Sequence, residues 1–480
     1  MVHTLIVGGG TAGCVLAARL SADPAHTVRV LEAGPGVVPP ELRDASRMPI
    51  GPDSPWLWRY PATLADGPEV TAELVRGRVI GGSSSVNGSY FVRAPAADFA
   101  AWTKELGGDE SWSFDAVLPA YRALERDADY GAAPGHGADG PIPVCRTADP
   151  APVSRAFAAA ARDAGFAELP DLNALPGSGP ADGVGPVPCN VADGERVGTA
   201  TAYLAPVLSR PNLTVDGGIL VTRILFRGDR AIGVEYRRGT AASSAWADRI
   251  VLCAGAIESA ALLLRSGVGP AADLAALGIP VVRDAPVGQW CTDHPEIGVA
   301  YRPGPQLPPR ATVPLEFALT VGGVEIRPYT VSFAPPEYRM GVALMRPRGS
   351  GALRLRVADP DRPPAITQHW LAERDDRETL RAGVSVALDV LARMPGTLPL
   401  RADPDTPWLR ANLSISQHLS GSCRMGTADD PRAVVDARLG VRGLTGLSVA
   451  DLSVVPVPLG RGPQASVVMI AERAARYLTP

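Results

Sequence analysis

The stretch Leu5-Ile6-Val7-Gly8-Gly9-Gly10-Thr11-Ala12-Gly13-Cys14-Val15-Leu16 sets a glycine-rich turn between an apolar strand and a run that can form a helix. Its glycines satisfy the pattern G-x-G-x-x-G of nucleotide-binding βαβ units. Gly8 permits the tight turn, Gly10 lets the backbone approach a pyrophosphate, and Gly13 lets the helix pack against the strand. The first helical amides, at Thr11 and Ala12, would donate to the phosphates. The stretch therefore predicts an α/β domain that binds a dinucleotide.

An acidic residue follows at the spacing that a nucleotide ribose requires. Residues 27–31 predict a second strand, which ends at Glu32, about 20 residues beyond the turn. A carboxylate at that position accepts hydrogen bonds from ribose hydroxyls and disfavours a 2′-phosphate. This pattern by itself does not separate NAD from FAD.

Two later segments have the character of strands that return to the same sheet. Residues 249–256 form a buried-strand pattern that ends in small residues such as Ala254, and residues 446–451 form another that ends at Ala450 and Asp451. In FAD proteins with a discontinuous Rossmann domain, late strands of this kind reach the dinucleotide. Each segment alone is also compatible with an ordinary strand of a parallel sheet.

Composition excludes several classes of protein. The 480 residues carry 46 Lys+Arg against 50 Asp+Glu, and the net charge of −4 argues against nucleic-acid binding. The start of the chain shows no secretory pattern, and there is no run of about 18 apolar residues. We therefore expect no membrane span and a cytoplasmic protein, with peripheral membrane association left open. The 6 cysteines are scattered, which predicts reduced thiols and no metal site.

Residues 77–90, GRVIGGSSSVNGSY, resemble the first signature of the glucose–methanol–choline (GMC) oxidoreductases. Residues 255–269, GAIESAALLLRSGVG, resemble the second signature and depart from it at Ala260, where the family prefers Pro or Ser. Shorter matches follow in the family's order over nearly the whole chain, at residues 112–119, 135–137, 202–204, 293–295, 416–426 and 434–436. The resemblance implies FAD as the cofactor.

The resemblance also implies the architecture, which is an α/β fold with an α+β substrate lobe. An FAD-binding Rossmann-like domain would be interleaved with an antiparallel-sheet substrate domain. The expected boundaries are 1–150, 190–290 and 405–480 for the FAD-binding domain, 151–190 for a lid over the flavin, and 291–405 for the substrate domain. Within the substrate domain the sequence predicts a strand at 353–357 and a helix at 377–394.

The loop at residues 81–90 offers glycines for close approach and short hydrogen-bonding groups that can cradle a pyrophosphate and the flavin edge. The residues expected to contact FAD are Gly8, Gly10, Thr11, Ala12, Gly13, Glu32, Arg78, Gly82, Ser83, Ser84, Asn87, Gly88, Val221, Ala254, Ala450, Asp451, Pro463 and Ala465. Some GMC relatives attach FAD covalently through a histidine of this loop. Val86 occupies that position here, so we expect non-covalent FAD.

The 6 histidines can be weighed one by one as catalytic bases. We expect His3 and His26 at the surface and His294 in a structural role. His418 lies in a segment that resembles the histidine-containing motif of the family, which implies that it is the base near the flavin. An imidazole can accept the alcohol proton at neutral pH while a hydride leaves the adjacent carbon.

The second active-site residue of the family, a His or Asn, is missing from the expected position near Gly462. Gln464 is the nearest residue with an amide. It can hydrogen-bond a substrate oxygen but cannot act as a base. Contact with flavin or backbone alone is the alternative for Gln464.

The resemblance implies an FAD-dependent oxidoreductase that oxidises the CH–OH group of a small alcohol to a carbonyl. A quinone, a redox partner or O2 would accept the electrons. Residues 325–330, 417–419 and 461–463 resemble the actinobacterial GMC dehydrogenase associated with mycofactocin, which would pass electrons from reduced mycofactocin towards respiration. The alternatives are an O2-using oxidase of small or sugar-like alcohols, a flavoprotein lyase, a NAD-dependent dehydrogenase and a non-catalytic flavin-binding protein.

Overall fold

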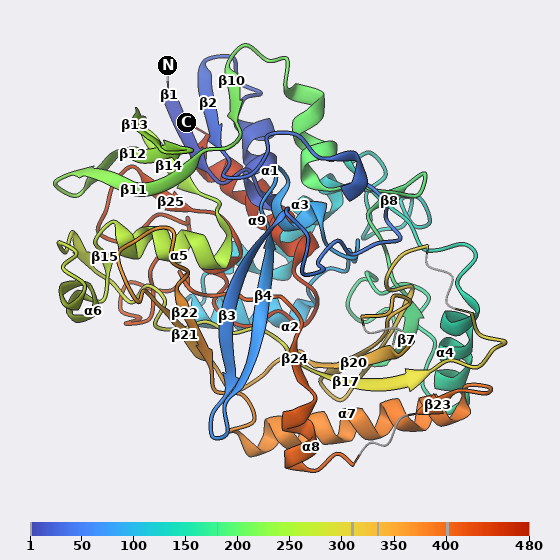
Figure 1. The fold of residues 1–480 in the computed structure, drawn as a ribbon. Helices are drawn as coiled ribbons and strands as arrows, with labels where there is room; N and C mark the ends of the chain where they lie inside the picture. Colours follow the sequence, from blue (N-terminus) through green and yellow to red (C-terminus); the bar gives the residue numbers. More distant parts are fainter. Residues whose placement is uncertain (1, 180, 309–311, 334–335, 400–402, 480) are drawn as a thin grey trace.

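The computed structural model describes residues 2–179, 181–308, 312–333, 336–399 and 403–479 (Figure 1). Its first layer is a parallel sheet in which every neighbouring pair of strands runs in the same direction. The strand order is β10 (Leu213–Asp216), β2 (His26–Leu31), β1 (Val2–Val7), β14 (Arg249–Leu252) and β25 (Leu447–Val449). Strands from the beginning, middle and end of the chain therefore meet in one sheet.

The turn after β1 has the conformation that its glycines predict. Gly8 has a φ of +96°, which a residue with a side chain rarely adopts. The helix α1 (Thr11–Leu20) begins at once and is buried along most of its length. A Cβ on Gly13 would lie 2.0 Å from the carbonyl oxygen of Gly8, so only glycine lets the helix pack this closely on the turn. The helix α9 (Gln464–Leu478) packs against α1.

The second layer is an antiparallel sheet on the far side of the molecule from β1 and β2 (Figure 1). Its order is β23 (Leu398–Pro399), β17 (Pro295–Arg302), β20 (Tyr338–Leu344), β19 (Val324–Pro328), β18 (Phe317–Val321) and β7 (Gly183–Pro186), with β24 (Leu413–Ile415) also paired to β17. The long helix α7 (Arg374–Arg393) packs on one face of this sheet, and α4 (Pro152–Asp163) packs on α7 and β18. The other face is turned towards the cavities described below.

A four-stranded and a three-stranded sheet lie beside these two layers. The hairpin of β3 (Leu57–Ala65) and β4 (Val70–Gly77) runs between the two layers and joins β22 (Ala365–Gln368) and β21 (Gly351–Arg354). An antiparallel sheet of β11 (Leu220–Arg227), β12 (Arg230–Arg238) and β13 (Ala241–Trp246) lies beside β14. The remaining helices are α2 (Ala96–Glu105), α3 (Phe114–Leu124), α5 (Gly255–Arg265), α6 (Ala271–Ala276) and α8 (Thr406–Ala411).

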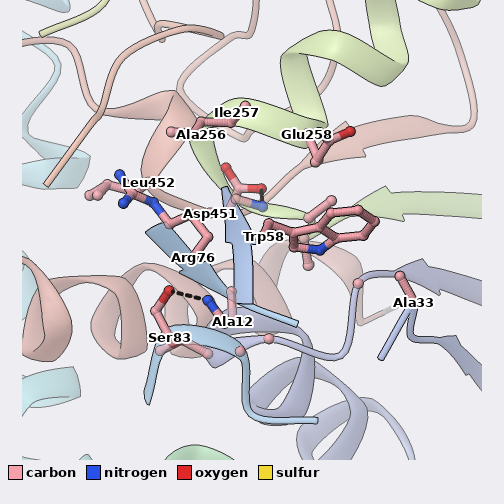
Figure 2. A pocket seen from close by; sticks show the side chains of 18 of the residues that line it. Ala12, Ala33, Trp58, Arg76, Ser83, Ala256, Ile257, Glu258, Asp451 and Leu452 are labelled. Carbon is pink, nitrogen blue, oxygen red and sulfur yellow. Dashed lines mark hydrogen bonds between the residues drawn. The ribbon is translucent and has the colours of Figure 1, made fainter. Parts of the chain in front are cut away.

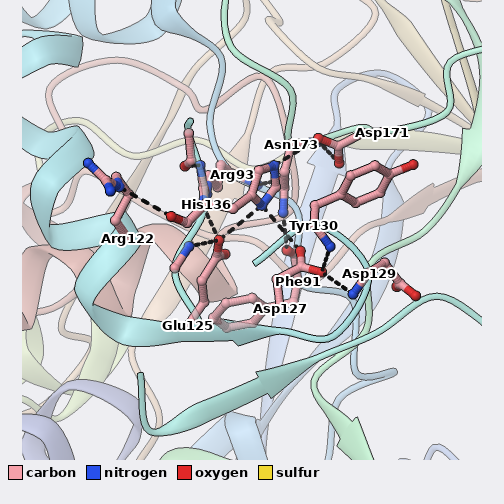
Figure 3. A network of polar contacts seen from close by, with 12 residues as sticks. Phe91, Arg93, Arg122, Glu125, Asp127, Asp129, Tyr130, His136, Asp171 and Asn173 are labelled. Atoms are coloured by element: carbon pink, nitrogen blue, oxygen red, sulfur yellow. Dashed lines mark hydrogen bonds and ion pairs between the residues drawn. The ribbon is translucent and has the colours of Figure 1, made fainter. Parts of the chain in front are cut away.

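A buried cluster of charges holds the loop that follows α3 (Figure 3). His136 is 4% exposed, and its two ring nitrogens contact Glu125 at 3.1 Å, Asp127 at 3.2 Å and Asp171 at 2.9 Å. Arg146 pairs with Asp127 and Asp171. Although burial by itself lowers the pKa of His136, the hydrogen bonds to the three carboxylates outweigh it and raise the pKa to about 10. His136 is therefore protonated at neutral pH and is held by three carboxylates.

The structure corrects several local predictions. His26 is 2% exposed rather than at the surface, because its Nε2 hydrogen-bonds Thr4 Oγ1 across β1 and β2 at 2.7 Å. The helix predicted at 377–394 is α7, which begins earlier and ends at Arg393. The strand predicted at 353–357 is β21, which ends at Arg354 because the chain then turns away.

The remaining expectations concern thiols and membranes. All six cysteines belong to the described residues and are free thiols. Among the helices of the described ranges, none is long and apolar enough to cross a bilayer.

Candidate active site

A deep cavity opens where the parallel sheet meets the β3–β4 hairpin (Figure 2). It is lined by residues from β1, β2, β3, β4, α5 and α9 and from the loops that join them. The predicted cofactor residues that line it are Gly8, Gly10, Thr11, Ala12, Glu32, Gly82, Ser83, Val221, Ala254, Asp451 and Pro463. The structure thus brings residues from the start, middle and end of the sequence to one cavity.

The N-terminus of α1 faces this cavity. Gly10 is the N-cap and has no side chain to satisfy the first helical N–H groups. A Cβ on Gly10 would meet nothing closer than 3.7 Å, so the approach to these amides is open. Free amides and the positive end of the helix dipole suit a pyrophosphate. This arrangement fits FAD.

Glu32 is held in place at the end of β2. Its carboxylate is 6% exposed and accepts hydrogen bonds from the N–H groups of Gly9 at 2.9 Å and Gly34 at 2.7 Å. Burial raises the pKa of Glu32 to about 7 against the opposing effect of these bonds. Each oxygen keeps a second lone pair for a ribose hydroxyl.

The loop after β4 crosses close to the α1 turn. Gly81 and Gly82 have φ of +86° and +55°, and a Cβ on Gly82 would lie 2.8 Å from the Cα of Gly10. Ser83 Oγ accepts the N–H of Gly77 at 3.2 Å and stays on the cavity wall (Figure 2). The two glycine turns therefore form the floor of the cavity together.

Five of the predicted cofactor residues lie outside the cavity wall: Gly13, Arg78, Ser84, Ala450 and Ala465. Ser84 Oγ donates to the carbonyl oxygen of Gly81 at 2.7 Å, so it stabilises the loop from below. Arg78 is exposed and stacks over the ring of Trp58, with 4.3 Å between its Cζ and the ring centroid. Ala450 and Ala465 are buried in the sheet and in α9.

A second cavity of about 190 Å³ adjoins the first on the side of the antiparallel sheet. Ser83, Gln417, Pro463 and Gln464 line both cavities, so the two lie side by side. The predicted residues Asn87, Gly88 and His418 line the second cavity alone. Its other walls are largely apolar and come from Met48, Ile50, Val75, Val86, Pro314 and Leu315, together with Tyr90, Arg327, Tyr329, Ser416 and Gly462.

His418 is paired with His294, which sequence reasoning assigned to a structural role. Nδ1 of one ring lies 2.9 Å from Nδ1 of the other, and His294 Nε2 lies 2.7 Å from the carbonyl oxygen of Leu459. A carbonyl only accepts, so the proton of neutral His294 is on Nε2 and its Nδ1 is an acceptor. His418 must then donate from Nδ1. Its Nε2 is left with a free lone pair, which is the form that a base requires.

Both imidazoles are neutral over the ordinary pH range. Burial, helped by the charge of Arg327, lowers the pKa of His294 to about 4. Burial lowers the pKa of His418 well below the usual value, and His294, Arg327 and Arg76 lower it further. The tautomers inferred from these contacts therefore apply at neutral pH.

Gln417 orients the segment that carries His418. Its φ of +67° is uncommon for a residue with a side chain and is held by neighbouring contacts. The amide oxygen accepts the N–H of Val75 at 2.9 Å, and the amide nitrogen donates to the carbonyl oxygen of Glu73 at 3.0 Å. The strand β4 therefore fixes the residue immediately before His418.

Two polar atoms around the cavities are buried without a partner among the described residues. They are Nε2 of Gln464 and Nη2 of Arg76, and each residue lines the first cavity. A buried donor without an acceptor is costly, which makes both atoms suited to a bound acceptor. The carbonyl and ring-nitrogen acceptors of a flavin are groups of this kind, so both donors fit FAD.

Sequence reasoning missed His294, Arg327, Arg76, Trp58 and Tyr90. His294 does stand in the matched stretch 293–295, so its motif was visible while its contact with His418 was not. Trp58 and Arg76 lie on the β3–β4 hairpin, where no motif marks them. The alternation Val-Glu-Ile-Arg at residues 324–327 was a signal, since it places two charges on one face of a strand.

Comparisons with known proteins agree with this geometry. Residues 2–296 match the N-terminal family model of the GMC oxidoreductases, and residues 347–471 match the C-terminal one. An uncharacterised GMC-type oxidoreductase of Rhodococcus erythropolis is 43% identical over 99% of this chain and 97% of its own. Mouse mitochondrial choline dehydrogenase is 35% identical over 98% of this chain and 88% of its own. A crystal structure of pyridoxine 4-oxidase from Mesorbium loti superposes with a TM-score of 0.90 at 31% identity, covering 100% of this chain and 99% of that one.

Proposed function

The chain belongs to the GMC oxidoreductase family, with FAD as its cofactor, and on that premise we propose that it oxidises an alcohol to a carbonyl compound with His418 as the general base. The observation that carries the proposal is the contact of His418 Nδ1 with His294 Nδ1, while His294 Nε2 is bound to Leu459. These contacts assign a lone pair to Nε2 of His418, a residue that lines the second cavity. Bound FAD supplies the two-electron acceptor for the hydride.

His418 accepts the hydroxyl proton of the alcohol on Nε2. His294 accepts the hydrogen bond that holds the existing proton of His418 on Nδ1 of His418. The ring of His418 can therefore take up the substrate proton on Nε2 without moving that first proton. A positioned base of this kind contributes about 10²–10⁴ to the rate. The positive charges of Arg76 and Arg327 near His418 favour negative charge on the substrate oxygen while the proton leaves.

Gln464 orients the reacting groups. It lines both cavities, and its Nε2 has a proton to donate to the substrate oxygen or to the flavin edge. Its side chain cannot act as a second base, so His418 alone accepts the proton. The cofactor residues that line the first cavity bind the pyrophosphate and ribose, and Ser84, Gly13, Ala450, Ala465 and Arg78 support that wall.

The electron acceptor is a quinone or redox partner in this proposal, with reduced mycofactocin as one substrate to test. An oxidase that uses O2 is the second candidate, because pyridoxine 4-oxidase covers the whole chain at 31% identity. A flavoprotein lyase is the third candidate, and it needs the same base, because cleavage of a hydroxynitrile also begins with loss of the hydroxyl proton. Bleaching of the oxidised flavin spectrum by an alcohol under anaerobic conditions separates the two reactions. We place the protein in the cytoplasm, with peripheral membrane contact left open.

We also propose that residues 1–150, 190–290 and 405–480 form the FAD-binding domain, 151–190 a lid, and 291–405 the substrate domain. The parallel sheet supports the first group of segments. β24 is an exception, because it pairs with β17 of the antiparallel sheet.

Replacement of the base tests the function. In His418→Ala, we expect the holoenzyme to keep FAD while the rate of anaerobic flavin reduction by an alcohol falls by about 10²–10⁴. His369→Ala is the matched control, because the side chain of His369 is 54% exposed and pairs with Asp66, and His369 lines neither cavity. Near-normal reduction by His418→Ala in stopped flow would overturn the assignment. Reoxidation by air against a quinone then separates an oxidase from a dehydrogenase.

A further inference from the structure

One charged side chain forms part of the wall of the second cavity, and it is Arg327 of β19. The alternation of the strand explains its position. Val324 packs towards α7, as shown by its proximity to Gly383, while Glu325 and Arg327 lie on the opposite face of the strand. Arg327 is 4% exposed and stays charged, because an arginine does not lose its proton in proteins.

The carboxylates that balance the positive charge of Arg327 do not line the second cavity. No carboxylate is among the described residues that line it. Glu325 accepts Arg327 Nε at 2.7 Å and the hydroxyl of Tyr90 at 2.8 Å. Glu296 accepts Arg327 Nη1 at 3.0 Å, Ser416 Oγ at 2.8 Å and the hydroxyl of Tyr329 at 3.3 Å.

Tyr90 and Tyr329 both line the cavity. Each ends in a hydroxyl that donates to one of the two glutamates, so the tyrosines stand between those charges and a ligand. Arg461 lies 3.7 Å from Glu325 and balances the second negative charge. A ligand in the cavity therefore meets a guanidinium directly and meets the carboxylates only through neutral phenols.

The guanidinium also has unused hydrogen-bonding capacity. Nε and Nη1 are occupied by Glu325, Glu296 and Ser416, whereas Nη2 lies 3.7 Å from the sulfur of Met345. A thioether is a weak acceptor, and Nη2 carries two protons.

We propose that Arg327 determines substrate specificity by accepting alcohols whose body is neutral or negatively charged and otherwise apolar, and by excluding cationic alcohols of the same shape. The proposal rests on the proposed alcohol oxidation. Under it, choline, the alcohol in the name of the mouse relative, is a poor substrate of this chain.

Binding of three nearly isosteric, unreactive ligands tests the proposal in the FAD-loaded wild-type protein. Benzoate, benzamide and benzamidinium carry charges of about −1, 0 and +1 at neutral pH and would perturb the flavin absorption spectrum from the adjoining cavity. We expect benzoate and benzamide to bind at least about tenfold more tightly than benzamidinium, since a like charge within a few ångströms of a partly screened cation is strongly unfavourable. Equal or tighter binding of benzamidinium would overturn the proposal.

Variants assign the effect to Arg327. We expect Arg327→Gln combined with Glu296→Gln, which removes one charge of each sign, to reduce the preference for benzoate over benzamidinium by at least about tenfold. Arg302→Gln is the control, because Arg302 lies on β17 of the same sheet, separated from β19 by β20, with its side chain 55% exposed. An unchanged preference in the double variant would exclude Arg327 as the determinant. If the double variant does not fold, the wild-type series still decides whether cations are excluded.

The two proposals fail in different ways. If no alcohol reduces the flavin, the proposed function is wrong, whatever the order of ligand affinities. If alcohols reduce the flavin but choline reacts as fast as its neutral isostere 3,3-dimethylbutan-1-ol, the function stands and the charge selection is wrong.

Discussion

Replacing His294 by leucine removes the acceptor that keeps the proton of His418 on Nδ1. In the native protein that proton is bound to His294 at 2.9 Å, and His294 is itself fixed by the carbonyl oxygen of Leu459 at 2.7 Å. In His294→Leu, a neutral His418 is free to carry its proton on Nε2 instead. In that tautomer the nitrogen that faces the substrate cannot accept a proton.

The expected loss of rate in His294→Leu follows from the burial of His294. His294 is 3% exposed, and a buried donor left without a partner costs about 1–3 kcal/mol. In His294→Leu, the active tautomer of His418 loses this free-energy advantage over the other neutral tautomer. A free-energy difference of about 1.4 kcal/mol corresponds to a factor of ten in their ratio. We therefore expect the limiting rate of flavin reduction to fall by roughly 10- to 100-fold. The apparent affinity for the alcohol should change little, because His294 does not line either cavity.

Anaerobic stopped-flow reduction of the FAD-loaded variants is the assay. His294→Gln is the matched variant, since a glutamine amide can donate to Leu459 and accept from His418 Nδ1. We expect it to recover most of the rate that leucine loses, with flavin content and melting temperature alike in both variants. The reasoning is refuted if His294→Leu reduces flavin at the wild-type rate, or if glutamine is as slow as leucine while both retain FAD.

Three further predictions concern the cofactor and the buried charges. Acid precipitation should release all of the flavin into the supernatant, because Val86 stands where some relatives carry the linking histidine; flavin in the pellet would contradict this. Gly82→Ala should lower the ratio of FAD to protein at least several-fold, since its Cβ would lie 2.8 Å from the Cα of Gly10 and its φ is +55°; full loading in the purified variant would contradict the proposed floor of the cavity. The pKa of His136 rises from 6.5 to about 10 on folding, so its contribution to stability is complete below pH 6.5 and is lost as pH rises towards 10. The melting temperature should fall over that window in wild type and fall less steeply in His136→Gln; parallel curves would exclude His136 as the cause.

The sequence predicted the parts of the molecule that depend on local rules or on family motifs. The turn at Gly8 and the close packing at Gly13 are steric requirements within a few residues, so the glycine pattern revealed them. The FAD cofactor and the GMC fold are confirmed by the family models over residues 2–296 and 347–471. The motif also marked His418, which lines the second cavity, and its role as the base stays a prediction.

Side-chain contacts between residues far apart in the chain could not be predicted from the sequence. His294 and His418 are far apart in the chain and meet because β17 and β24 pair in antiparallel register. No local sequence pattern predicts the pairing of β17 with β24, because β24 has only three residues. Arg327 was read as part of a motif, although its role depends on hydroxyls and carboxylates contributed by other strands. The burial of His26 likewise depends on the neighbouring strand that carries Thr4.

The order of the parallel sheet has a consequence for biosynthesis. β25 and α9 are among the last elements to be translated, yet Asp451 and Gln464 belong to the wall that receives the cofactor. A nascent chain that has exposed only β1, α1 and β2 to solvent holds the phosphate-binding turn without the opposite side of the cavity. We therefore expect stable binding of FAD only after both segments have been synthesised and α9 has docked. A messenger truncated before residue 446 would yield a colourless chain with exposed apolar strands, which cellular quality control can recognise.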